Sequence, residues 1–217
     1  MKMVTGIKPA ALLAAALFLL GPVLARADFP GPPVDPAIQG GPRTAVFAGG
    51  CFWGVEAVFE RLQGVQEVVS GYSGGEQKTA SYPLVGTGRT GHAESVRITY
   101  DPARVSYGTL LKVLFSVAHD PTQLNYQGPD HGTQYRSAIF FADESERRVA
   151  EEYIRALDKA RVFPRKIVTQ LAPLEAFYPA EEYHQDYLKG NPTQPYIVMW
   201  DLPKLAHLER EYPQLLR

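Results

Sequence analysis

Cysteine is scarce in this 217-residue sequence and occurs once, at Cys51. One cysteine excludes an internal disulfide and cannot build a structural zinc centre. Basic and acidic residues nearly balance, with a formal net charge of −1, so the composition gives no sign of a nucleic-acid partner. The glycine-rich stretches lack the lysine of a phosphate-binding loop, and no internal repeat is visible. The single thiol is therefore either an inert residue or a reactive group left unpaired.

Residues 1–27 have the pattern of a secretory signal peptide. Lys2 and Lys8 give a basic start, the 11 residues from Ala10 to Leu20 are apolar, and Ala25-Arg26-Ala27 is a small-x-small cleavage signal. The apolar run is shorter than the about 20 residues of a transmembrane helix. We expect cleavage after Ala27, export to the periplasm, and a monomer that is not attached to the membrane.

The rest of the chain divides by composition into three parts. Residues 28–43 are rich in proline and glycine, which predicts an extended linker or arm. Residues 44–200 carry the apolar patterns of one catalytic domain of ordinary size. Residues 201–217 are a C-terminal tail, and the segment 189–217 as a whole is expected to be mostly irregular, with a helix near residues 205–210.

Apolar periodicity predicts interleaved strands and helices in the central part. The expected strands are 44–48, 65–69, 93–100, 137–141 and 167–171, and the expected helices begin near residues 55, 106, 144 and 179. Polar loops are expected at 76–92 and 121–134. The order predicts an α+β fold, a two-layer sandwich in which helices pack mainly on one face of a mixed or antiparallel sheet around a ferredoxin-like core.

Cys51 falls between a predicted strand and a predicted helix. The first turn of a helix has unpaired N–H groups and a positive dipole end, so this position favours a thiolate and lowers the cysteine pKa from its usual value of about 8.5. An inert, buried cysteine is the competing interpretation, because free cysteine is among the most buried residue types. The neighbouring motifs have to decide between the two.

Glu94 interrupts the alternation of its strand, because it lies in phase with the apolar residues Val96, Ile98 and Tyr100. One interpretation is a solvent-facing residue at the start of the strand. The other is a partly buried carboxyl group with a raised pKa, which can act as a general acid near neutral pH. His92, two residues earlier, is either its partner or part of a turn.

A dense polar cluster runs from Asp130 to Ser137, directly before a buried strand. It is interpreted as a loop that carries site residues, since such loops concentrate binding groups, although a solvated turn has the same composition. Four tyrosines, Tyr72, Tyr82, Tyr135 and Tyr196, lie in predicted loops or at the ends of elements. Tyrosine hydroxyl groups can donate hydrogen bonds to an oxyanion while the rings form apolar walls.

Five motifs carry a family resemblance: Gly50-Cys51-Phe52-Trp53-Gly54, Gly71-Tyr72-Ser73-Gly74-Gly75, Gly91-His92-Ala93-Glu94, Asp130-His131-Gly132-Thr133-Gln134-Tyr135-Arg136-Ser137 and Tyr183-His184-Gln185-Asp186-Tyr187-Leu188. Together they resemble the peptide methionine sulfoxide reductases of the A class, over residues 43–200. The resemblance implies an α+β sandwich and reduction of the S epimer of methionine sulfoxide, protein-bound and free. It implies that Cys51 attacks the sulfoxide sulfur and becomes a sulfenic acid, while Glu94 protonates the oxygen. The other implied site residues are Tyr82 and Tyr135 on the oxygen, Phe52 and Trp53 around the methyl group, and Asp130 and Tyr196 as further substrate contacts.

The sequence departs from many members of that family at the C-terminal end. Ile197 stands where a second, resolving cysteine is common, and the chain has no other cysteine. We therefore expect an external thiol to reduce the sulfenic acid: a thioredoxin-like or glutaredoxin-like protein, or a small thiol. No bound cofactor or metal is expected. The expected substrates are free methionine sulfoxide and oxidised proteins, whose repair counters oxidative stress.

Two other functions use the same residues differently. An exported cysteine hydrolase would combine Cys51 with a histidine base, His92 or His131, and an oxyanion hole at the helix start. A binding module for methionine-rich segments would keep Cys51 merely buried. Loss of activity in histidine variants would indicate the hydrolase, whereas a methionine sulfoxide-dependent sulfenic acid on Cys51 would exclude the silent binder.

Overall fold

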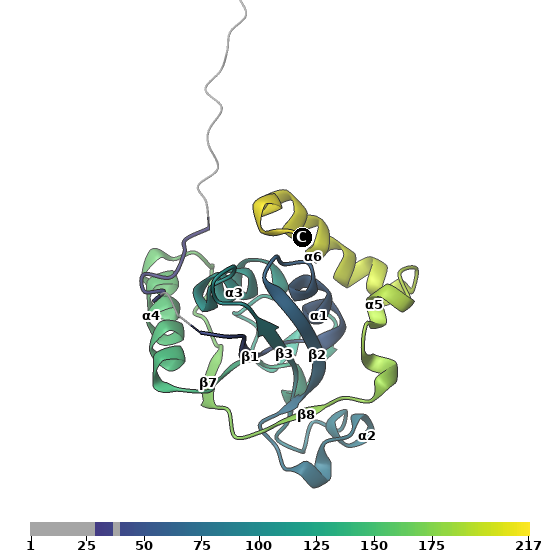
Figure 1. The fold of residues 1–217 in the computed structure, drawn as a ribbon. Coiled ribbons are helices and arrows are strands. Elements are labelled where there is room, and N and C mark those ends of the chain that lie inside the picture. The colour runs from purple at the N-terminus through teal and green to yellow at the C-terminus, as the bar shows by residue number, and fades with distance from the viewer. Residues whose placement is uncertain (1–28, 37–39) are drawn as a thin grey trace, which may run out of the picture.

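A six-stranded mixed sheet organises the fold in the computed structural model, which describes residues 29–36 and 40–217 (Figure 1). The strand order is β7-β6-β1-β3-β2-β8. The strands are β1 (Arg43–Gly49), β2 (Val65–Ser73), β3 (Ala93–Tyr100), β6 (Ser137–Phe141), β7 (Gln170–Pro173) and β8 (Phe177–Pro179). Only the β6–β7 pair within this sheet is parallel.

Helices cover one face of this sheet. They are α1 (Phe52–Glu60), α2 (Tyr82–Val85), α3 (Tyr107–Val113), α4 (Glu144–Ala160), α5 (Tyr187–Gly190) and α6 (Leu202–Glu211). Because side chains alternate along β1, Ala45 and Phe47 join the large core beneath α1, α3 and α4. Val46 and Ala48 face the other way, into a small cluster that Phe177 helps to cover. The α+β sandwich predicted from the sequence is confirmed; the ferredoxin-like label stays a prediction.

The predicted elements between residues 160 and 190 were wrong in detail. The last predicted strand starts at Gln170 instead of residue 167, because Val168 N–H donates to Pro121 O at 2.8 Å outside any sheet. The predicted helix at 179–188 is instead the end of β8, a 3-10 helix at Glu182–His184, and α5. Asp186 has a left-handed conformation, with φ of 51°, and this residue separates the 3-10 helix from α5.

Both long polar loops contain short elements that the sequence did not predict. The first includes a 3-10 helix at Gln77–Thr79 and α2. The second contains a hairpin of β4 (Tyr126–Gln127) and β5 (Asp130–His131). Two-residue strands leave no detectable alternation in a sequence, so only the structure could reveal them.

The C-terminal segment is more regular than predicted. A π-helix at Ile197–Asp201 continues into α6, which lies beside α1 (Figure 1). Leu205 and Leu208, spaced three residues apart, are buried there. Arg217 N–H then donates to Arg61 O at 3.0 Å. The helix expected near residues 205–210 is therefore present, and it is longer than predicted; the expectation that the rest is mostly irregular was wrong.

The described part of the arm, residues 29–36, has neither helix nor strand and lies against the domain. Phe29 makes an edge contact with Phe163, with ring centroids 6.0 Å apart. Asp35 accepts a hydrogen bond from Gly108 N–H at 3.0 Å, near the start of α3. The predicted signal peptide, residues 1–27, lies outside the described residues. Within the described ranges, no helix is long and apolar enough to cross a membrane.

Candidate active site

Cys51 occupies the N-cap position of α1, two residues after the end of β1. Gly50 before it has φ of 90°, a conformation that favours glycine. A Cβ atom on Gly50 would stand 2.5 Å from the Gln127 side chain, so a larger residue would also collide with the β4–β5 hairpin. The turn therefore holds the thiol at a fixed point, with 9% of the cysteine exposed.

The thiol opens into a cavity of about 220 Å³. The residues that line it are Cys51, Phe52, Trp53, Tyr82, Glu94, Asp130, Tyr135, Gln194 and Tyr196. All eight residues that the sequence suggested as site residues thus meet around one space, and Gln194 is an addition. They come from α1, α2, β3, the segment from Asp130 to Tyr135, and the turn before the π-helix.

Glu94 is buried at the edge of this cavity, with 2% of the residue exposed. Its Oε2 accepts a hydrogen bond from Phe52 N–H at 3.1 Å, which ties β3 to the first turn of α1. Burial raises the pKa of Glu94 to about 8, against the lowering effect of that hydrogen bond, and the nearby Asp130 charge raises it further. At neutral pH the carboxyl group therefore carries a proton. It does not face solvent, and His92 is not its hydrogen-bond partner.

The pKa of Cys51 is shifted in the opposite direction from the sequence-based expectation. Burial raises it well above the usual value, and the charges of Glu94 and Asp201 raise it further. The backbone N–H of Trp53, at the start of the helix, does lower it. The helix effect is real but smaller than the cost of removing the thiolate from water. The expected resting thiolate was wrong.

Three tyrosine hydroxyl groups surround the cavity. Burial raises the pKa of Tyr82 to about 12 and raises those of Tyr135 and Tyr196 as well. All three therefore keep their protons and can donate hydrogen bonds. The Tyr196 hydroxyl donates to Asp130 Oδ2. The fourth tyrosine, Tyr72, lies behind the cavity and donates to Glu181 Oε2 at 2.9 Å.

Aromatic rings hold the apolar side of the cavity. Trp53 stacks on Tyr187, with ring centroids 3.7 Å apart and planes 10° apart. Its indole Nε1–H donates to His184 Nδ1 at 3.1 Å. The His184 ring also lies 5.0 Å from the Phe52 ring and 4.3 Å from the Tyr82 ring. His184 and Tyr187 belong to the motif from Tyr183 to Leu188, which indicated no role for them; in the structure they support Trp53.

A buried ion pair next to the thiol was missed. Asp201, with no exposed surface, pairs with Lys204, Nζ to Oδ1 being 3.0 Å. Asp201 Oδ1 lies 2.0 Å from where a Cβ on Gly54 would stand, so only glycine fits in this turn of α1. The Asp201 charge raises the pKa of Cys51, and the Lys204 charge lowers it. The signal in the sequence that could have indicated this ion pair is the three-residue spacing of Asp201 and Lys204 at the start of an apolar helical pattern.

The histidines considered as a hydrolase base do not line the cavity. His92 Nε2 is 3.1 Å from the backbone oxygen of Glu76. His131 stacks on Tyr126, with ring centroids 5.4 Å apart. The histidine-based alternative is therefore not supported. Within residues 29–36 and 40–217 there is also no group of three or more histidine, cysteine, aspartate or glutamate residues that could hold a metal ion.

A thiol, a protonated carboxyl group and hydroxyl donors around one side-chain-sized cavity define the class: an enzyme with a cysteine nucleophile and an acid partner. The family model "Peptide methionine sulfoxide reductase" matches residues 43–215, and the chain belongs to this family.

The sequence is similar to those of known proteins over most of its length. It is 58% identical to the peptide methionine sulfoxide reductase MsrA 2 of Mesorhizobium japonicum over 84% of this chain and 93% of that protein. It is 53% identical to the Synechocystis protein of the same name over 82% and 83%. Among solved structures, reduced Mxr1 of Saccharomyces cerevisiae is similar, with a TM-score of 0.65, 32% identity, and coverage of 75% of this chain and 92% of that chain. Methionine sulfoxide reductase A of Corynebacterium diphtheriae has a TM-score of 0.63 at 38% identity, with coverage of 72% and 78%.

Proposed function

We propose that this protein reduces the S epimer of methionine sulfoxide to methionine, in oxidised proteins and as the free amino acid. The observation that carries the proposal is the pairing of Cys51 with a protonated Glu94 in one cavity. A sulfoxide oxygen leaves sulfur readily only after it has been protonated, so a thiol nucleophile needs an acid in the same cavity. The names and identities of the relatives support the same activity.

The reduction can be written with these groups alone. The Cys51 sulfur attacks the sulfoxide sulfur and forms an S–S bond, while the oxygen takes the proton of Glu94 and becomes a hydroxyl group. The thiol proton passes to the Glu94 carboxylate. The S–S bond and the methionine S–O bond then both break: the S–S electron pair stays on the methionine sulfur, and the hydroxyl group transfers with the S–O electron pair to the Cys51 sulfur, which becomes a sulfenic acid. Methionine sulfur gains two electrons and cysteine sulfur loses two.

The remaining residues orient the substrate. Tyr82 and Tyr135 donate hydrogen bonds to the oxygen as negative charge develops there. Phe52 and Trp53 enclose the S-methyl group, and Asp130, held by Tyr196, contacts the polar part of the substrate. A sulfoxide sulfur is pyramidal and chiral. The site fixes three directions around this sulfur: those of the oxygen, the methyl group and the attacking thiol. Only one of the two epimers can therefore bind in the reactive orientation.

An external thiol completes the cycle. The chain has no second cysteine, and buried Ile197 stands in the C-terminal π-helix where a resolving cysteine is common in the family. One thiol condenses with the sulfenic acid to a mixed disulfide and water, and a second thiol releases the Cys51 thiol and leaves as a disulfide. A thioredoxin-like protein, a glutaredoxin-like protein and a small thiol are the three candidate reductants.

We further propose that the protein acts after export, as a monomeric repair enzyme in the periplasm under oxidative stress. The support is the pattern of residues 1–27, together with a single unpaired cysteine. Cell fractionation followed by intact mass of the purified protein tests this. A cytoplasmic protein that retains residues 1–27 would refute it.

Turnover of the two separated epimers tests the activity itself. Wild type and Cys51→Ser are assayed with dithiothreitol, and each candidate reductant is then substituted in turn. We expect methionine only from the S epimer and only from wild type. A sulfenic acid probe should add to Cys51 in wild type after exposure to the sulfoxide without reductant. Turnover of the R epimer, or activity in Cys51→Ser, would contradict the proposal.

A further inference from the structure

The cavity around Cys51 has room for one side chain and not for a polypeptide. Its volume of about 220 Å³ is below the about 300–1,000 Å³ of pockets that enclose whole small ligands. When the substrate is a protein, the residues on either side of the oxidised methionine must therefore lie outside, on the rim. The chemistry of the rim decides which sequences fit there.

The rim is where large apolar side chains remain exposed. Among the described residues these side chains are Leu84, Leu124, Tyr183, Val198, Met199 and Trp200. Every one belongs to a segment that supplies a cavity residue or packs against one. Apolar side chains that stay exposed close to a binding cavity are candidates for contacts with a larger ligand. By contrast, the exposed face of α4 carries charges arranged in ion pairs, such as Arg148 with Glu152.

The first group of exposed apolar residues lies on the Tyr82 side. Leu84 follows Tyr82 by two residues in α2 and is 44% exposed. Tyr183 is 61% exposed, and its ring centroid lies 4.2 Å from that of His184. The His184 ring in turn contacts the Tyr82 ring, so Leu84 and Tyr183 lie on the Tyr82 side of the cavity, and neither of them lines it.

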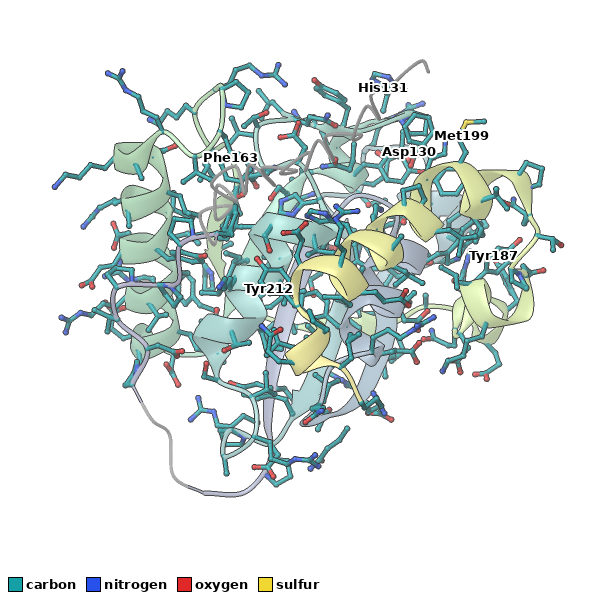
Figure 2. All side chains as sticks on the ribbon, turned by 90° about the horizontal axis from the view of Figure 1, so that it is seen from above. Asp130, His131, Phe163, Tyr187, Met199 and Tyr212 are labelled. Atoms are coloured by element: carbon teal, nitrogen blue, oxygen red, sulfur yellow. The ribbon has the colours of Figure 1, made fainter. Side chains whose placement is uncertain are left out.

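The second group lies on the side of Asp130 and Tyr196. Val198, Met199 and Trp200 follow Tyr196 in the π-helix, and Met199 is 64% exposed. Figure 2 shows the Met199 side chain projecting outward from the molecule. The Trp200 ring covers Gly128, at the turn of the hairpin that carries Asp130. Leu124 precedes that hairpin and is also exposed.

We infer that this apolar rim binds the apolar residues that flank an oxidised methionine in an unfolded or flexible polypeptide. The inference rests on the proposed function and names its preferred substrate class. Both groups adjoin walls that contact the same bound side chain. A polypeptide whose oxidised methionine occupies the cavity therefore crosses the rim on both sides of that methionine. Apolar neighbours of methionine are buried in folded proteins and become available when a protein unfolds.

The test compares substrates that differ only outside the cavity. The substrates are N-acetyl-methionine sulfoxide amide, a five-residue peptide with leucine two positions on each side of the sulfoxide, and the same peptide with serine at those positions. The variants are Leu84→Ser, Met199→Ser and their double variant. Lys159→Ser, on the exposed face of α4, is the matched control. Dithiothreitol is the reductant throughout.

We expect the double variant to lose about tenfold in kcat/KM for the leucine peptide, mainly through KM, because two partly buried apolar contacts are removed. Turnover of the small sulfoxide and of the serine peptide should stay at the wild-type value, as should every rate of Lys159→Ser. An equal loss on all substrates would overturn the inference, as would no loss on the leucine peptide.

A competing occupant of the rim is a protein reductant, and the same variants identify it. Normal peptide reduction with dithiothreitol, combined with slow turnover when a thioredoxin-like protein replaces it, would assign the rim to the reductant and overturn the inference. Failure of the proposed function has a different signature, because wild type would then leave even the small sulfoxide unreduced.

Discussion

Replacing Glu94 with glutamine should stabilise the protein increasingly as the pH rises, while it removes the acid of the site. Glu94 is buried, and its pKa is raised from 4.5 to about 8. The folded protein therefore holds a proton that the unfolded chain releases at a much lower pH. Glutamine is neutral in both states, and its side-chain oxygen can still accept the hydrogen bond from Phe52 N–H.

The sign and size follow from proton linkage. Below pH 4.5 Glu94 is protonated in both states, so its contribution is fully present. Between pH 4.5 and about 8 only the folded state holds the proton, and the free energy of unfolding of wild type falls by about 1.4 kcal/mol per pH unit relative to Glu94→Gln. The difference reaches about 3 kcal/mol at pH 7 and about 4 kcal/mol at pH 8. Above that the folded protein also releases the proton, and the difference levels off.

Urea unfolding followed by circular dichroism at pH values from about 5 to 8 measures this difference. Glu67→Gln is the matched control, because Glu67 is an exposed carboxyl group on β2 of the same sheet. Its effect should stay small at every pH, since the side chain is hydrated in both states. If wild type and Glu94→Gln keep a constant difference in free energy across this range, Glu94 is not a protonated acid at neutral pH, and its assigned role fails.

Three further predictions concern activity and the thiol. Glu94→Gln should lower kcat/KM for the S sulfoxide by about 10²–10⁴-fold, and wild-type activity should fall above pH 8 as Glu94 ionises; a mild effect would favour another acid. Asp201→Asn should lower the pKa of Cys51, and Lys204→Met should raise it. The pH dependence of iodoacetamide alkylation measures both shifts. Shifts in the same direction would show that the Asp201–Lys204 pair has only a structural role. Tyr135→Phe should lower kcat more than it raises KM, because its hydroxyl group acts on developing charge; a pure KM effect would contradict this.

The sequence carried enough information to find the acid and the cavity walls. Glu94 was identifiable because a carboxyl group in phase with Val96 and Ile98 must share their buried face, and it does. The cluster that starts at Asp130 was identifiable because packing does not explain so many polar groups before a buried strand. Both signals are local, and local patterns survive in a sequence without any structure.

What the sequence could not supply depends on contacts between distant segments. The direction of the Cys51 pKa shift is set by burial, then by Glu94 and by Asp201, both of which are distant from Cys51 in the chain. A rule for helix N-termini alone predicts the wrong sign. The three residues of β8 are extended because they pair with Gly71, Tyr72 and Ser73 of β2, and their own pattern is too short to indicate a strand.

The raised pKa values of Cys51 and Glu94 suit the chemistry, although a resting thiolate was expected. Conversion of a thiol and a sulfoxide to a sulfenic acid and a thioether neither consumes nor releases protons overall. A site that starts with both protons can therefore move one to the substrate oxygen and return the other to Glu94 without solvent. Because the thiolate forms only when a substrate accepts a proton, the resting cysteine stays the less nucleophilic thiol. Burial thus protects Cys51 from stray oxidants, and this chain has no second thiol with which to regenerate it.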